Sequence, residues 1–391
     1  MGHKLQKSLI PAIKSIQEHV LVPGTSHQDL WLGPSLVFKP GTPVEDLHLF
    51  FTVSDRTGGD SIQRNLHFTA SRAPENADDF SEWHTTWERL DYPETLRERT
   101  DARGYRFVPT FNWKYHPASG KIIGFGHVLR HQGEQLSAHV EHCQISCAVY
   151  DPDAGTFSPW DAFRIDVEGE ARPCVGYGQR VDLVHGDILL PFSTVKELNG
   201  RHSIRWCGSA RCHFDGQRMH VVDIGNLQTI DAPRGLVEPS LACYGDTYYM
   251  TLRAQDGHAH VTTSTDGLTW APPIPWRWTQ GGAIAMDQTM TKFVNGPRGL
   301  FLVYTRITED NTRVFRHRAP VYIAQVNPET CTLCRETESV LLGNRGFPLG
   351  NFNVASISPH EVWVTAPEWD RSGRNVPCDN RLARIIWNLN A

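Results

Sequence analysis

Residues 238–270 read EPSLACYGDTYYMTLRAQDGHAHVTTSTDGLTW, and the last seven of them form the pattern S-x-D-G-x-T-W. Asp266 and Gly267 stand where a tight turn needs a side chain that bonds its own backbone and a residue free to adopt positive φ. Trp270 follows, as an anchor that packs between neighbouring sheets. Glu238 and Arg253 precede the turn, each near the end of an expected strand. The turn predicts a β architecture, and the charged pair suggests a site beside it.

Short strand-like runs fill the rest of the chain. Runs of about five to eight residues, separated by Gly, Pro, Asp and Asn, are typical of β-strands. The clearest examples lie within 47–55, 121–129, 187–195, 246–254, 299–307 and 361–369. Helical patterns are limited to residues 1–20, which are expected to be helical or extended, and weakly to 78–90. Many short strands joined by turns predict a sandwich, a barrel or a propeller.

Degenerate copies of the turn decide between these architectures. Residues 71–83 and 150–160 each follow a strand pair and end in Trp, and residues 324–334 form a copy without the Trp. Recurrence along the chain favours a propeller of repeated sheets. We therefore predict a single domain over residues 1–391, an all-β propeller with six blades, or alternatively seven.

Composition and charge limit the kinds of partner and the cellular compartment that we expect for this protein. The net charge of −5 argues against a general nucleic-acid binder, and no apolar run approaches the length of a membrane helix. The first residues lack the apolar core of a signal peptide, so the sequence as given predicts a cytoplasmic protein, or a periplasmic or secreted one if a leader was removed. The pair Cys331 and Cys334 has no second pair at zinc-finger spacing. No metal ion and no cofactor is predicted.

On these motifs the chain resembles the sialidase (neuraminidase) superfamily over nearly its whole length, the S-x-D-G-x-T-W turn being that family's Asp-box or BNR repeat. Pro34 and Leu36 match the family's opening R-I-P-x-L motif, although Leu32 stands where the first arginine of its arginine triad belongs. Gly176 and Gly178 begin a run similar to the family's third-blade motif.

The resemblance also implies a set of site residues. Asp60 matches the family's acid/base aspartate, and Glu238 matches the glutamate that polarises its nucleophilic tyrosine. The substrate-binding residues that it implies are Arg56, Gln179, Arg180, Arg253, Arg318, Asn351 and Asn353. His127, at an expected strand end, is a further candidate for a catalytic base. Each has a structural alternative, such as a turn for Asp60 or an ion pair between blades for Arg253.

The tyrosine of the family is missing. Its place aligns with Gly350–Asn353, where Phe352 has no oxygen with which to attack a sugar. We therefore expect a sialidase-like glycoside hydrolase with a non-standard mechanism, in which Asp60 and Glu238 act as acid and base on a terminal acidic or unusual sugar. One alternative is a polysaccharide lyase that uses arginine with His or Tyr, and a second is a non-catalytic glycan-binding propeller. The expected partner is a glycan or oligosaccharide, not a nucleic acid or a membrane.

Overall fold

The structure is a computed structural model that describes residues 12–24, 29–38, 47–55, 63–71, 86–90, 93–97, 99–132, 135–136, 144–168, 173–286, 289–370 and 378–389. The regular structure of these residues is β-strand, together with the short 3-10 helices η1 (Glu94–Leu96), η2 (Glu309–Asn311), η3 (Phe315–His317) and η4 (Arg335–Thr337). No helix among these residues is long and apolar enough to cross a membrane. Asp60 and Arg56 lie outside the described residues.

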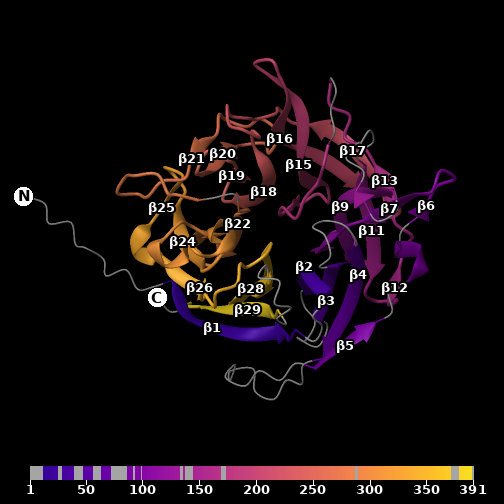
Figure 1. Ribbon diagram of the computed structural model, residues 1–391, viewed down its shortest axis with the longest axis horizontal. Helices are drawn as coiled ribbons and strands as arrows, with labels where there is room; N and C mark the ends of the chain where they lie inside the picture. The colour runs from indigo at the N-terminus through magenta and orange to yellow at the C-terminus, as the bar shows by residue number, and fades with distance from the viewer. Residues whose placement is uncertain are drawn as a thin grey trace, which may run out of the picture.

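The described strands form six antiparallel sheets, which lie around a central axis in Figure 1. The first sheet holds β2 (Asp29–Phe38), β3 (Leu47–Asp55), β4 (Gln63–Ser71) and β5 (Thr86–Leu90). The second holds β6 (Arg99–Thr100), β7 (Tyr105–Pro109), β8 (Asn112–His116), β9 (Lys121–Gln132), β10 (Gln135–Leu136), β11 (Ile145–Asp151), β12 (Thr156–Phe157) and β13 (Asp161–Phe163). The third holds β14 (Val181–Asp182), β15 (Ile188–Leu198), β16 (Arg201–Phe214) and β17 (Met219–Ile224).

The remaining sheets complete the ring. The fourth holds β18 (Val237–Tyr244), β19 (Thr247–Arg253), β20 (Ala259–Ser264) and β21 (Ile274–Pro275). The fifth holds β22 (Lys292–Gly296), β23 (Gly299–Tyr304), β24 (Val321–Asn327), β25 (Thr332–Leu333) and β26 (Ser339–Leu342). The sixth holds β27 (Asn353–Ser358), β28 (Glu361–Pro367), β29 (Asn380–Trp387) and β1 (Ile13–Val22). The molecule is thus an all-β propeller, as predicted.

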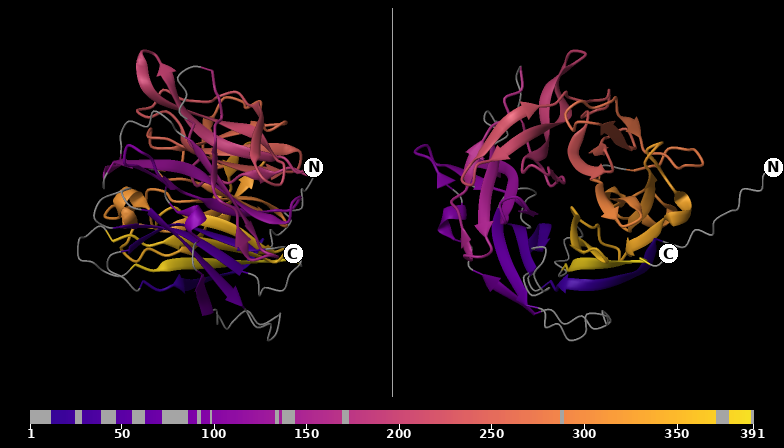
Figure 2. Two further views of the ribbon diagram at one scale, coloured as in Figure 1. Left: turned by 90° about the vertical axis from the view of Figure 1, so that its right-hand side faces the viewer. Right: turned by 180° about the vertical axis from the view of Figure 1, so that it is seen from behind.

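The two ends of the chain meet in the sixth sheet. Strand β1 pairs antiparallel with β29, with Ile16 opposite Ile385, and Figure 2 shows the two strands side by side from behind. Of the two alternatives expected for residues 1–20, helical or extended, residues 13–20 show the extended one, whereas the weak helical pattern is wrong for residues 86–90, which form β5. In both segments, pairing with a strand elsewhere in the sheet outweighs the local helical pattern.

The apolar core is divided among the interfaces between neighbouring sheets. One cluster joins β15 and β16 to β18 and β19, through side chains such as Leu189, Cys207, Leu241 and Met250. Others join the fourth sheet to the fifth and the fifth to the sixth. A central strand of a sheet is therefore covered on both faces, which is why β23 and β28 are buried along their whole length instead of alternating.

The Asp-box turn connects β20 to β21 and locks two sheets together. The Asp266 carboxylate accepts hydrogen bonds from the backbone N–H groups of Leu268 and Thr269, at 2.8 and 2.6 Å. Trp270 is buried, and its indole N–H donates to Ser209 Oγ of β16 at 2.8 Å. The structure confirms the predicted turn and the predicted role of Trp270 as an anchor between sheets.

Candidate functional site

Glu238 is aimed by a distortion at the start of β18. The pairing of β18 with β19 slips between Val237 and Ser240, and Glu238 has a φ of +52°. Such a bulge redirects a side chain, and positive φ in a residue other than glycine costs free energy that the surrounding structure has to offset. A strained acidic residue on the innermost strand of its sheet is a candidate for function.

Glu238 forms an ion pair with Arg253 within the fourth sheet. Arg253 Nη1 donates to Glu238 Oε2 at 2.8 Å, and 28% of the Glu238 side chain remains exposed while only 6% of the Arg253 side chain is. Burial works to raise the pKa of Glu238, but the charge and hydrogen bond of Arg253, with the charges of Arg318 and Arg234, lower it. Glu238 is therefore a carboxylate at neutral pH and is unable to serve there as a proton donor.

Two of the predicted arginines converge on this carboxylate. Arg253 is the last residue of β19 and lies opposite Val237. Arg318 follows η3 and is buried, and its positive charge lowers the pKa of Glu238. A Cβ placed on Gly176 would lie 3.8 Å from Glu238 Cγ, so the segment before β14 also approaches the site. His127 of β9 contacts the same segment, since its Nδ1 lies 3.3 Å from the carbonyl oxygen of Val175.

A layer of polar side chains crosses the axis of the ring, and its member on β18, Ser240, is two residues after Glu238. It takes one residue from the innermost segment of each sheet, namely Ser35, Asn112, Gln179, Ser240, Lys292 and Asn353. We call these six residues the polar layer. The Asn353 amide nitrogen contacts Ser35 Oγ and Asn112 Oδ1 at 3.3 and 3.2 Å, and Asn112 donates to the Gly178 carbonyl oxygen at 2.9 Å.

Gln179 closes the other half of the polar layer. Its side chain donates to the Phe293 carbonyl oxygen at 2.8 Å and accepts from the Phe293 N–H at 2.6 Å and from Ser240 Oγ at 3.0 Å. Gly178 has no room for a side chain, since a Cβ there would lie 1.9 Å from the Pro239 carbonyl oxygen. The sequence run Gly176–Gln179 therefore serves contact between sheets, and the side chains of Gln179 and Asn353 are occupied by other parts of the protein.

Lys292 is the charged member of the polar layer. Its side chain is buried, and Nζ donates to Asn353 Oδ1 at 2.8 Å. Burial lowers the pKa of Lys292 to about 7, although the charge of Glu238 acts in the opposite direction. Sequence reasoning missed this residue, because a lysine at the start of a short strand usually faces water.

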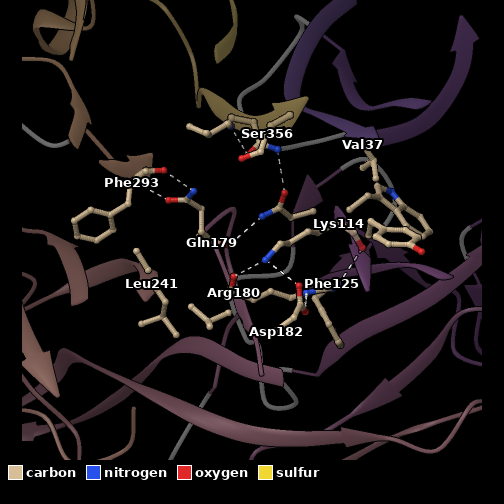
Figure 3. Close-up of a pocket in the computed structure, with 18 of the residues that line it drawn as sticks. Val37, Lys114, Phe125, Gln179, Arg180, Asp182, Leu241, Phe293 and Ser356 are labelled. Carbon is tan, nitrogen blue, oxygen red and sulfur yellow. Dashed lines mark hydrogen bonds and ion pairs between the residues drawn. The ribbon is translucent and has the colours of Figure 1, made fainter. Parts of the chain in front are cut away.

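A cavity of about 480 Å³ lies on the other side of the polar layer (Figure 3). Its lining follows the layer residues along the inner strands, with Leu241–Cys243 after Ser240 and Val354–Ser356 after Asn353, whereas Glu238 precedes Ser240. Glu238, Arg253 and Arg318 are not among the lining residues. The charged site therefore does not line this cavity, and its ionisable groups lie at the Glu238 end of β18.

Arg180 lines this cavity, but each of its three guanidinium nitrogens donates a hydrogen bond within the protein. Nε donates to Asp182 at 2.9 Å, and the two terminal nitrogens donate to the carbonyl oxygens of Ile123 and Lys114 at 2.7 and 3.0 Å. Figure 3 shows Arg180, Asp182 and Lys114 close together on one wall. The structure thus places Arg180 in a network between the second and third sheets, apart from Glu238.

The segment implied to hold the tyrosine leads into β27. Phe352 is buried in the cluster between the fifth and sixth sheets, and Asn351 beside it is half-buried. Phe352 is therefore part of the apolar core. Any nucleophile of this site comes from another position.

Comparisons with known proteins agree on the fold. No protein-family model and no curated protein matches the chain. Among solved structures, the chain is similar to a Dyadobacter fermentans protein of unknown function, with 14% identity, a TM-score of 0.54 and coverage of 97% of this chain and 100% of the other.

Two neuraminidase structures are also similar. A Trypanosoma rangeli sialidase, solved with 2,3-difluorosialic acid as a covalent intermediate, has 10% identity and a TM-score of 0.62, covering 96% of this chain and 59% of the other. The parainfluenza virus 5 haemagglutinin-neuraminidase ectodomain has 10% identity and a TM-score of 0.57, covering 96% and 84%. At these identities the shared feature is a sialidase-like propeller fold.

Proposed function

We propose that the six sheets are six blades of sialidase type and that the protein is a glycoside hydrolase acting on a terminal acidic sugar. The observation that carries this proposal is the pair of Glu238 and Arg253 at 2.8 Å, with the buried Arg318 beside it. Two guanidinium groups suit a planar carboxylate on a substrate, because each offers a fork of donors. The fold similarity to a sialidase solved with a sialic acid derivative supports this substrate class.

The charge of Glu238 decides its role in this proposal. Since neighbouring arginines keep Glu238 ionised, it accepts a proton from water or stabilises positive charge on the sugar, and it is not the general acid. The acid that protonates the leaving oxygen is then a second group, for which Asp60 is the candidate from the sequence. With Phe352 in the core, a covalent tyrosine intermediate at that position is not part of the mechanism.

The test is a screen of acidic glycans that measures new reducing ends and ultraviolet absorbance together. We expect reducing ends without absorbance from the wild type, and a loss of roughly 10²–10⁴-fold in turnover for Glu238→Gln. Glu338→Gln is the matched control, because Glu338 also binds an arginine, Arg306, at 2.8 Å, but precedes the outer strand β26.

Two other results contradict the proposal. A product that absorbs in the ultraviolet would identify a lyase, which removes a proton from a uronate and leaves a double bond. Glycan binding without turnover, unchanged in Glu238→Gln, would identify a binding propeller.

A further inference from the structure

Two further arginines, Arg205 and Arg234, lie next to the Glu238 site. Arg234 is exposed and stands shortly before β18 in the segment that leads to Glu238. Arg205 of β16 is tied to that segment, because its backbone N–H donates to the Arg234 carbonyl oxygen at 2.9 Å and its own carbonyl oxygen accepts from Leu236 at 3.0 Å. The backbone therefore brings both arginines to the end of β18 that carries Glu238.

The neighbouring carboxylates are engaged with other arginines. Asp231 pairs with Arg201, and Glu238 pairs with Arg253. Within the part of the chain that the structure describes, no ion pair links Arg205 or Arg234 to a carboxylate. Burial and the charges of Arg205, Arg253 and Arg316 together lower the pKa of Arg234. Cations gathered in this way repel one another, and an anion bound among them would relieve the repulsion.

This cluster of arginines is positively charged, whereas the chain as a whole carries a net charge of −5. Besides Arg253 and Arg318, it contains Arg205 and Arg234, and Glu238 is the carboxylate whose charge acts on Arg234. One substrate carboxylate neutralises only part of this charge. A second anionic group on the same ligand would use the remaining guanidinium forks.

We propose that the site selects a sugar with two anionic groups, in which Arg253 and Arg318 hold a carboxylate and Arg205 and Arg234 hold a sulfate or phosphate ester. This inference rests on the proposed function, since it names the substrate class of the same site. It assigns Arg205 and Arg234 as specificity-determining residues. It does not require them to take part in bond cleavage.

The test compares binding of matched uronate disaccharides that differ only in one O-sulfate or O-phosphate, measured by titration calorimetry at several salt concentrations. The proteins are the wild type, Arg234→Gln, the double variant Arg205→Gln/Arg234→Gln, and the control Arg218→Gln. Arg218 is an exposed arginine just beyond the opposite end of β16. Arg234 is exposed, so its single variant is expected to fold even if the double variant does not.

We expect the wild type to prefer a disaccharide with the additional anion. Each substitution in the cluster should weaken binding of that ligand by about tenfold and leave the uronate-only ligand close to unchanged. The dependence of affinity on salt should become less steep, while Arg218→Gln matches the wild type. Which ester binds more tightly distinguishes sulfate from phosphate.

Equal weakening of all disaccharides, or no wild-type preference for the second anion, would overturn the inference. Parallel measurement of new reducing ends separates it from the proposed function. Hydrolysis of acidic glycans with no preference for the second anion would contradict only the inference. Arginine-dependent preference without hydrolysis of any glycan would contradict only the proposed enzyme.

Discussion

At the scale of single residues, the buried Lys292 gives a prediction about pH. Its folded pKa of about 7 lies below its ordinary value of 10.5, so the folded protein bears the cost of a buried charge at pH values below about 7. That cost falls as the pH rises from about 7 towards 10.5, because the unfolded chain keeps its proton there while the folded chain loses it. The contribution of Lys292 to stability therefore increases with pH in this window.

We expect Lys292→Met to remove this pH dependence. The difference in unfolding free energy between wild type and variant should move in favour of the wild type from pH 7 to pH 10, by up to several kcal/mol. Denaturant unfolding of both proteins at a series of pH values measures it. A constant difference across the window would show that Lys292 is protonated throughout in the folded state. Loss of the hydrogen bond to Asn353 changes the size of the difference in unfolding free energy but does not make that difference rise with pH.

At the scale of elements, the Asp-box turn is a structural joint between two sheets. Asp266 accepts two backbone hydrogen bonds and a third from Thr269 Oγ1 at 2.8 Å, and Gly267 approaches Leu189 of β15. Because these bonds shape the turn that presents Trp270, we expect Asp266→Ala to lower the unfolding free energy by about 1–3 kcal/mol. Thermal and denaturant unfolding measure this loss.

Asp215→Ala is the matched control for the turn. Asp215 also accepts backbone hydrogen bonds, from Gln217 at 2.8 Å and Arg218 at 2.7 Å, but its hairpin is exposed. The control should destabilise the protein less, and both variants should keep any glycan activity. A fall in activity for Asp266→Ala at a temperature where the variant is fully folded would contradict the assignment of a purely structural role.

At the scale of the whole molecule, closure of the ring by β1 and β29 should make unfolding cooperative. Ile16 of β1 packs against the cluster between the fifth and sixth sheets, whereas Val20 on the same strand is exposed. We expect Ile16→Lys to lower the unfolding free energy by about 1–3 kcal/mol and Val20→Lys by less than about 0.5 kcal/mol. Fluorescence and circular dichroism should show one shifted transition for Ile16→Lys. A separate early transition would mean that the sixth sheet opens by itself.

Much of the fold was predictable, because the signals that specify it are local. The Asp-box depends on hydrogen bonds between residues within the turn, and strands such as β3 and β19 follow from runs of β-forming side chains. Glu238 and Arg253 were also found as a pair, since they lie at the facing ends of two consecutive strands. The sequence left open whether the β1 segment is helical or extended, because its partner strand, β29, lies at the other end of the chain.

The candidate site was predictable only in part. Glu238, Arg253 and Arg318 come together, and Arg234 could have been suspected from its place in the segment leading to Glu238. In contrast, Arg180, Gln179 and Asn353 hold neighbouring sheets together, and no local pattern separates such arginines and amides from ligand-binding ones.

The sequence by itself determined the turn chemistry, the β-strands and the loss of the family's tyrosine, because each depends on residue types at neighbouring positions. Only the tertiary structure decided which polar side chains are free to meet a ligand. The polar layer joins residues as far apart as Ser35 and Asn353, and the burial of Lys292 depends on contacts from other sheets. Charge and exposure at the axis are properties of the closed ring, so they arise only when all the sheets are in place.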